Sequence, residues 1–535
     1  MPYSRIRVKP QNARHTTATS LMAKSGVNLR DLPQLMSPDF ALQNENYFVT
    51  TDGGLSKRKG LIELTTVAGN KPVTLLDEWK GYYIFGYETT VAAYNPDTGT
   101  VTNIKTNWST NAPFSGGSYG DYFFVGNTGN KIHYITEAAG VFTITEIAAA
   151  PLSGVIRPIG PRLYAGVGTD VYYCSVDTGS NPPFTNWTVA ATATAAGIVS
   201  FRNAGTVRSI CSLGDIIVAF GDTGKYAFRI TTQNDGTGTI VKLEEVVIDR
   251  VDMGGASGAI TTPKGLFYVN KSGLWQLISL GQPNIPFSDQ EGLTSVLLGT
   301  GYFDNVTLDN CDLTYYARFN SVLVTCAKAS SRNNHVLTYN TENKAFSVFK
   351  NWNINRWMVV SGEVYGGSAV KTTLYSCFNG NSDDGVPIAT SYIQEMRCGE
   401  LWTRQMLYGA YIDGKLHPLS APVVAFDIYN VRGELEENKL SFTWRAGYNV
   451  NTLDGWGKAE YGKSSWGGDV DTSGTLESFA GMHQFIRNFQ RIRIHITEGS
   501  ELPHEITWFS LDARAKANIR RRNLELTTPT ANLLN

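Results

Sequence analysis

The sequence predicts an all-β chain, built as a β-propeller with an additional β-rich platform domain. Of 535 residues, 53 are glycine and 11% are aromatic, whereas only 17% are charged. This composition is typical of many short strands joined by tight turns. A hairpin pattern recurs through the middle of the chain, and longer strand patterns follow it. The same observations leave open a β-sandwich or an irregular array of hairpins.

The first element is an N-terminal arm and docking segment over residues 1–60. One short helix is expected near residues 37–43. The segment holds nine lysines and arginines against four acidic residues, which gives it a net charge of +5. Because the whole chain carries −1, the remainder carries −6. The near-neutral total argues against a dedicated nucleic-acid binder with a strongly basic surface.

The second element is the predicted propeller, residues 61–380. Each copy of the repeat is a short β-forming run, a turn and a second short strand, as in 121–126 followed by 131–135. Spacings of 40 to 55 residues between copies are typical of propeller blades, which contain several strands each. The seven copies begin near residues 81, 121, 162, 215, 265, 320 and 372.

The third element is a C-terminal β platform domain, residues 381–535, with longer strands predicted at 423–429, 440–444 and 491–496. It carries an inserted loop, 446–481, rich in glycine, serine and aspartate. Loops of this length in a compact domain are usually functional or disordered. Trp456 and Trp466 in this loop are candidates for contact with a neighbouring subunit or partner, with sugar stacking as the alternative.

A closed ring of blades brings its entry and exit close together. We therefore expect residues 1–60 to pack with residues 381–535, with the propeller inserted between them. The basic flank is expected to dock on an acidic partner ring, because complementary charge fixes register. Contact with DNA phosphates is the rival interpretation. The candidate ring-docking residues are Arg5, Arg7, Lys9, Lys57, Arg58 and Lys59.

A candidate basic strand face lies near the C-terminus. If residues 487–496 form one strand, its period of two places Arg487, Arg491 and Arg493 on one face. Such a face can contact phosphate, DNA or acidic groups of a partner. The alternative is an ordinary solvated strand face.

The sequence shows no catalytic constellation, so we expect no enzymatic activity, no metal and no cofactor. The seven histidines lack metal-ligand spacing, and nucleophile-elbow, Walker and dinucleotide-binding motifs do not occur. The best carboxylate pair, Asp383–Asp384, precedes a glycine and is interpreted as a hairpin turn. No run of 18 apolar residues predicts a membrane span.

Three stretches together resemble the tail nozzle proteins of short-tailed bacteriophages, also called packaged-DNA stabilisation or tail tubular proteins. The first runs from Asn28-Leu29-Arg30 through Ser37-Pro38-Asp39-Phe40-Ala41-Leu42 and Asn46-Tyr47-Phe48 to Lys57-Arg58-Lys59-Gly60-Leu61. The second is Gly214 to Gly221, a mid-chain blade strand. The third is Phe485 to Ile494, followed by Ile506-Thr507-Trp508-Phe509.

This resemblance implies a structural virion protein located in the phage tail and assembled in the host cytoplasm. Such proteins form a homo-oligomeric ring, usually a hexamer, below the portal and adaptor rings. They continue the DNA channel, retain the packaged genome until ejection and carry tail fibres or tailspikes. Genomic double-stranded DNA passes through without sequence-specific binding.

Two other functions stay open. One is a glycan-binding or glycan-cleaving propeller, such as a phage depolymerase. Paired carboxylates and stacked aromatic residues converging in one pocket would favour it. The other is a lectin-like or scaffold propeller of a host.

Overall fold

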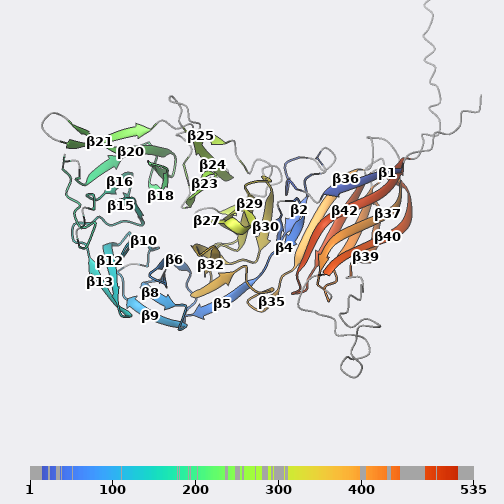
Figure 1. Ribbon diagram of the computed structural model, residues 1–535, viewed down its shortest axis with the longest axis horizontal. Helices are drawn as coiled ribbons and strands as arrows, with labels where there is room; N and C mark the ends of the chain where they lie inside the picture. The colour runs from blue at the N-terminus through green and yellow to red at the C-terminus, as the bar shows by residue number, and fades with distance from the viewer. Residues whose placement is uncertain are drawn as a thin grey trace, which may run out of the picture.

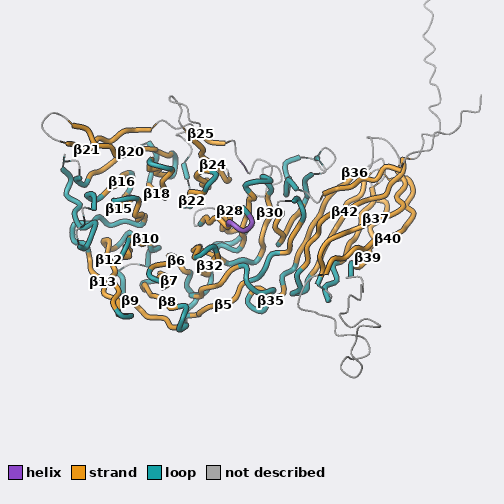
Figure 2. Tube along the Cα trace, in the orientation of Figure 1, coloured by secondary structure: helices purple, strands orange, loops and turns teal. Residues whose placement is uncertain are grey.

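The computed structural model describes residues 15–515 except 22–23, 32–35, 38, 51, 110, 178, 180, 191, 193, 202, 235–238, 247–253, 256–257, 271–272, 280–286, 291–292, 294–305, 308–310, 398–404, 418, 430–434, 446–475 and 490. The regular structure in these residues is almost entirely β-strand (Figure 2), beside a one-turn 3₁₀ helix at Ala317–Phe319. The predicted all-β class is confirmed.

Seven four-stranded antiparallel units follow one another along the chain. The first three are β6 (Val73–Trp79), β7 (Tyr82–Tyr87), β8 (Thr90–Asn95) and β9 (Thr100–Lys105); β10 (Ser115–Tyr119), β11 (Tyr122–Asn127), β12 (Asn130–Ala138) and β13 (Val141–Glu146); and β14 (Val155–Ile159), β15 (Arg162–Val167), β16 (Asp170–Tyr173) and β17 (Gly197–Ser200). The next two are β18 (Val207–Leu213), β19 (Ile216–Gly221), β20 (Lys225–Asn234) and β21 (Thr239–Val246); and β22 (Ala259–Thr262), β23 (Gly265–Asn270), β24 (Gly273–Ser279) and β25 (Phe287–Gln290).

The last two units include strands from outside the repeat. The sixth is β27 (Leu313–Tyr316), β28 (Ser321–Lys328), β29 (His335–Asn340) and β30 (Phe346–Lys350), with β26 (Val306–Thr307) also paired to β28. The seventh is β31 (Ile354–Val360), β32 (Glu363–Ser368), β33 (Thr373–Cys377) and β5 (Leu61–Thr66), extended by the hairpin β34 (Ser382–Asp383) and β35 (Val386–Pro387).

These units close into a ring (Figure 1), which gives a seven-bladed propeller. The first strand of each unit contacts the first strand of the next, and β31 of the seventh contacts β6 of the first. The ring is also closed in the seventh sheet, where β5 from the start of the chain pairs with β33. Strands that are remote in sequence therefore complete the last blade.

Turn residues set the hairpins of the blades. Lys80–Gly81, Ala139–Gly140 and Ser361–Gly362 each have positive φ at both positions. Each pair connects two strands through a two-residue loop. Such loops match the right-handed twist of the strands they join, and glycine adopts positive φ at no steric cost.

Several blades have a glycine near the end of the second strand, where the reason is lack of space for a side chain and not turn geometry. A Cβ built on Gly126 would lie 2.9 Å from Ile156 Cδ1 of the next blade. A Cβ on Gly367 would lie 2.5 Å from Val73 Cγ1, across the junction that closes the ring. The repeated glycine thus leaves room for an inner-strand side chain of the neighbouring blade.

Beside the propeller lies a β-sandwich, drawn in blue and in orange to red at the right of Figure 1. One sheet holds β1 (His15–Leu21), β3 (Tyr47–Val49), β4 (Leu55–Lys57), β37 (Gln405–Leu416), β40 (Leu476–Phe489) and β42 (His504–Ala515). The other holds β2 (Gln43–Glu45), β36 (Thr390–Arg397), β38 (Val423–Tyr429), β39 (Leu435–Thr443) and β41 (Arg491–Glu498).

Alternating apolar residues from the two sheets form the sandwich core. Phe426 and Ile494 come from one sheet, and Ile412 and Phe509 come from the other, all fully buried or nearly so. The Phe426 and Phe509 rings lie 6.0 Å apart between their centroids. The period of two on β41 places its isoleucines and Glu498 on the inward face and Arg491, Arg493 and His495 on the opposite face.

The two flanks of the chain build this sandwich together, and the packing expected between them is confirmed for their described strands. β1 and β4 both pair with β42, and β2 pairs with β36. β2 also runs parallel to β30, so the sheet of the sixth blade continues into the sandwich. The helix expected near residues 37–43 is wrong: Ala41 forms a bridge with Val27, and Gln43 begins β2.

Candidate functional site

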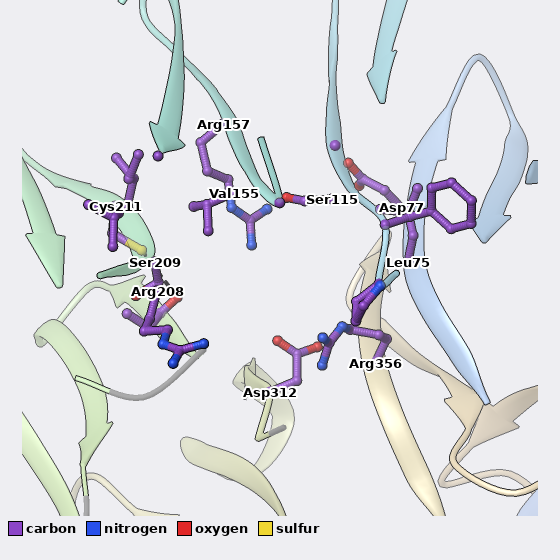
Figure 3. Close-up of a pocket in the computed structure, with 18 of the residues that line it drawn as sticks. Leu75, Asp77, Ser115, Val155, Arg157, Arg208, Ser209, Cys211, Asp312 and Arg356 are labelled. Carbon is purple, nitrogen blue, oxygen red and sulfur yellow. Dashed lines mark hydrogen bonds between the residues drawn. The ribbon is translucent and has the colours of Figure 1, made fainter. Parts of the chain in front are cut away.

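The axis of the propeller contains a cavity of about 970 Å³. Its lining comes from the inner strands β6, β10, β14, β18, β22, β27 and β31 or from residues beside them. Inner strands of a propeller converge on its axis, so one side chain from each of several blades reaches the same space. Figure 3 shows this convergence for residues from different blades.

Three arginines from three blades line the cavity: Arg157, Arg208 and Arg356. Arg356 is positioned by its Nε, which donates to the Thr74 carbonyl oxygen at 2.9 Å. Arg208 Nε pairs with Asp222 Oδ1 at 2.5 Å. Arg157 is exposed to the cavity, and among the described residues it forms no salt bridge.

Two carboxylates line the same space. Asp312 Oδ2 accepts a hydrogen bond from the Trp357 backbone N–H at 2.8 Å, which fixes its orientation beside β31. Asp77 Oδ1 accepts one from the Glu78 N–H at 2.9 Å. Burial raises the pKa of Asp77 to about 6, although the nearby Arg157 guanidinium opposes this rise. Asp77 is therefore partly protonated near neutral pH.

The candidate docking residues Lys57 and Arg58 do not form a surface, and that prediction is wrong for both. Their side chains are 2% and 1% exposed. Arg58 forms two hydrogen bonds with Asp383, at 2.7 and 2.5 Å, and its guanidinium lies 4.6 Å from the Trp352 ring centroid. The charge of Arg58 is therefore used inside the subunit, where it links the segment after β4 to the β34 hairpin.

Lys57 belongs to a buried polar network in the sandwich. Its Nζ lies 3.1 Å from Glu498 Oε2, and the same oxygen lies 2.6 Å from His504 Nδ1. Tyr47 Oη lies 2.7 Å from His504 Nε2, and Ser420 Oγ donates to Glu498. His504 thus lies between two partners, with Nε2 within hydrogen-bond distance of the Tyr47 hydroxyl and Nδ1 in ion-pair contact with the Glu498 carboxylate.

Of the other candidate docking residues, Lys59 is exposed and stays a candidate. Arg5, Arg7 and Lys9 lie outside the described residues, as do Trp456 and Trp466. Of the predicted inserted loop 446–481, residues 446–475 lie outside the described residues, and residues 476–481 belong to β40 and not to a loop.

The predicted basic strand face is wrong, because Arg487 lies on β40 and the other two arginines lie on β41, in different sheets. Arg491 and Arg493 both pair with the buried Glu395 of β36, at 2.8 and 3.3 Å. Their guanidiniums lie 4.4 and 5.1 Å from the Tyr429 ring centroid. These two cations are therefore bound within the subunit.

The interpretation of Asp383–Asp384 as a hairpin turn is confirmed. Asp384 and Gly385 have positive φ and connect β34 to β35. Asp383 is the partner of Arg58 and also accepts from Trp352 Nε1 at 2.9 Å.

The hairpin pattern in the sequence covers the second and third strands of the blades. The charged cavity residues lie on first strands or beside them, so the pattern does not identify these residues. The inner strand of each blade precedes this pattern and is less regular in sequence. The sequence does contain a signal, a charged residue within a short β-forming run: Arg157 and Arg356 are each the single charged residue of their run, and Asp77 is followed by Glu78. The runs around Asp77 and Arg157 lie directly before the copies of the hairpin pattern that begin near residues 81 and 162.

No protein-family profile matches the sequence, and no curated protein matches it. Among solved structures, the chain resembles the computationally designed Ika8 protein at 10% identity and a TM-score of 0.36, over 59% of this chain and 99% of that one.

It also resembles an extracellular domain from B. thetaiotaomicron in two crystal structures, one described as a one component and one as a hybrid two component system. The identities are 12% and 13%, and both TM-scores are 0.41. The matches cover 73% and 66% of this chain and 48% and 42% of those chains. Among the described residues, no helix is long and apolar enough to cross a membrane.

Proposed function

We propose that this chain is a structural protein of a short phage tail, where it forms a homo-oligomeric ring, in our proposal a hexamer. The ring continues the DNA channel from the portal and adaptor, retains the packaged genome and carries fibres or spikes. Genomic DNA passes through it without sequence-specific contacts.

One observation supports this proposal most. The two outer stretches that resemble tail nozzle proteins, 28–61 and 485–509, lie at opposite ends of the chain but contribute strands to one sandwich. A resemblance that is spread along the sequence thus falls on one structural unit. The resemblance implies a β-propeller together with a β-rich platform.

The sandwich also supplies surfaces suited to assembly. β40 is 14 residues long and, within the described residues, pairs with β37 alone. β39 ends the other sheet in the same way, paired with β38. Sheet edges carry unpaired backbone donors and acceptors, which a neighbouring subunit can use.

The test uses DNA-filled heads that bear the adaptor ring and lack the tail. Incubated with the full chain, they should gain a ring below the adaptor in electron micrographs and protect their DNA from added nuclease. Failure to bind these heads, together with release of oligosaccharide from a host surface polysaccharide, would overturn the proposal in favour of a depolymerase.

Lys59→Glu tests the remaining docking candidate in the same assay, with Lys264→Glu on an exposed blade turn as the matched control. We expect the first variant to bind heads several-fold more weakly and the control to bind normally, because repetition around a ring multiplies small charge effects. Equal binding by both variants would exclude Lys59 from the interface.

A further inference from the structure

The axial cavity is lined by charged side chains that a purely structural propeller axis would not require. Guanidinium groups reach it from β14, from β18 and from β31, and Asp312 faces them. Figure 3 shows Arg157, Arg208 and Asp312 directed toward the space that the blades enclose. Arg208 is already paired with Asp222, whereas Arg157 forms no salt bridge among the described residues, so Arg157 is the group of the lining that can bind an anion.

A second observation is independent of this charge. Ser209 Oγ and Trp357 Nε1 are buried polar atoms, and among the described residues neither has a hydrogen-bond partner. Both residues line the cavity and are more than nine-tenths buried. A buried hydroxyl or indole N–H without a partner is costly, and each such group calls for a specific explanation.

The size of the cavity favours an organic small molecule over a small inorganic ion. Small-molecule sites measure roughly 300–1,000 Å³ and combine apolar walls with a few placed polar groups. The volume of about 970 Å³ is far more than an inorganic anion fills. Leu75, Phe114 and Val155 supply apolar wall between the charged groups. A ligand with one anionic group and several hydroxyls matches this lining.

We propose that the axial cavity of the propeller binds an acidic saccharide, a sugar that carries a carboxylate. Arg157 binds the carboxylate, because its guanidinium is exposed to the cavity and forms no salt bridge among the described residues. Asp312 and Ser209 bind sugar hydroxyls. The site does not depend on the proposed tail function, since it lies wholly within one subunit.

Isothermal titration of the full chain with glucuronic acid tests the site, with glucose as the neutral match. We expect glucuronate to bind at least about tenfold more tightly than glucose. Arg157→Gln should weaken glucuronate binding about tenfold, since it removes the charge while keeping a polar side chain. Arg318→Gln is the control, because Arg318 is exposed and lies outside the cavity lining; it should leave binding unchanged.

Ser209→Ala provides a second variant whose fold is not at risk, because the hydroxyl has no partner to lose among the described residues. It should keep or raise the thermal midpoint of the parent, because the unpaired buried hydroxyl is removed, and it should weaken glucuronate binding several-fold. No difference between glucuronate and glucose would overturn the proposal. So would glucuronate binding that both cavity variants leave unchanged, or competition by inorganic phosphate at equal strength, which would indicate a plain anion site.

Discussion

The propeller and the sandwich use charge in opposite ways. In the propeller, ion pairs such as Lys80–Asp121 lie on the surface, with side chains 29% and 84% exposed. In the sandwich and at its junction with the seventh blade, Lys57–Glu498 and Arg58–Asp383 are almost completely buried. Exposed pairs contribute little to stability, whereas breaking a buried pair leaves a charge without its partner.

The difference follows from how each region is assembled. Most blades consist of four consecutive strands, so hairpin turns and apolar faces are sufficient to specify them. The sandwich joins strands that are more than 440 residues apart, as in the pairing of β4 with β42. Buried pairs between such remote segments favour one arrangement over other pairings of similar β-strands. Charged residues in the flanks therefore hold the subunit together.

We expect the largest effect when a buried ion pair is broken. Arg58→Ala removes both hydrogen bonds to Asp383 and leaves that carboxylate in a poorly solvated site. We expect the free energy of unfolding to fall by about 3–5 kcal/mol. Urea denaturation followed by tryptophan fluorescence measures this change. Lys59→Ala, the exposed neighbour, should stay within about 0.5 kcal/mol; a similarly small loss for Arg58→Ala would contradict the structural role.

The second effect concerns the buried network around Glu498. Burial raises the pKa of this carboxyl, but hydrogen bonds and charges from His504, Lys57 and Ser420 outweigh burial and hold it at about 2, below its ordinary 4.5. Burial also lowers the pKa of His504. Both folded-state pKa values lie below the unfolded values, so this stabilisation is complete at neutral pH and is lost on acidification.

Unfolding should therefore become easier below about pH 6.5, the ordinary pKa of histidine, and more steeply so below 4.5. The Glu498 shift corresponds to about 3 kcal/mol once the group is protonated in both states. Urea midpoints measured between pH 8 and pH 3 check this prediction. Glu498→Gln should be less stable than the parent at pH 7 and should show a flatter pH profile; identical profiles would refute it.

A smaller effect tests the apolar packing between blades. Gly367→Ala places a methyl group 2.5 Å from Val73 Cγ1, at the junction that closes the ring. We expect a loss of about 1–3 kcal/mol, typical of overpacking a filled interior. Gly499→Ala is the matched control, because no atom lies within 4 Å of its added Cβ. Equal thermal midpoints for the two variants would show that the junction yields without cost.

We expect the smallest effect when an exposed ion pair is broken. Asp121→Asn removes the surface partner of Lys80, whose Nζ lies 3.1 Å from the carboxylate. We expect a change of about 0–1 kcal/mol in the free energy of unfolding, decreasing further in high salt. A salt titration of the parent and the variant measures it. A loss comparable to that of Arg58→Ala would show that burial does not distinguish the two regions.

The sequence predicted the blades well because their information is local. Runs such as 121–126 and 131–135 pair with a neighbour in sequence through a short connection, so the period is visible without any remote partner strand. The candidate site was not predicted in this way. Arg157, Arg208 and Arg356 lie in separate repeats, and only closure of the ring brings them to one axis.

For the flanks, the sequence determined that basic residues are concentrated at 57–59, and only the tertiary structure decided which of them meets solvent. Lys57 and Arg58 point inward because β4 pairs with β42 and the following segment contacts the β34 hairpin, whereas Lys59 stays exposed. Likewise, the local pattern is compatible with one strand over residues 487–496, but β40 and β41 lie in different sheets. Local pattern fixes whether a residue favours a strand, since that depends on its neighbours in sequence. Burial and pairing depend on remote strands, which no local pattern contains.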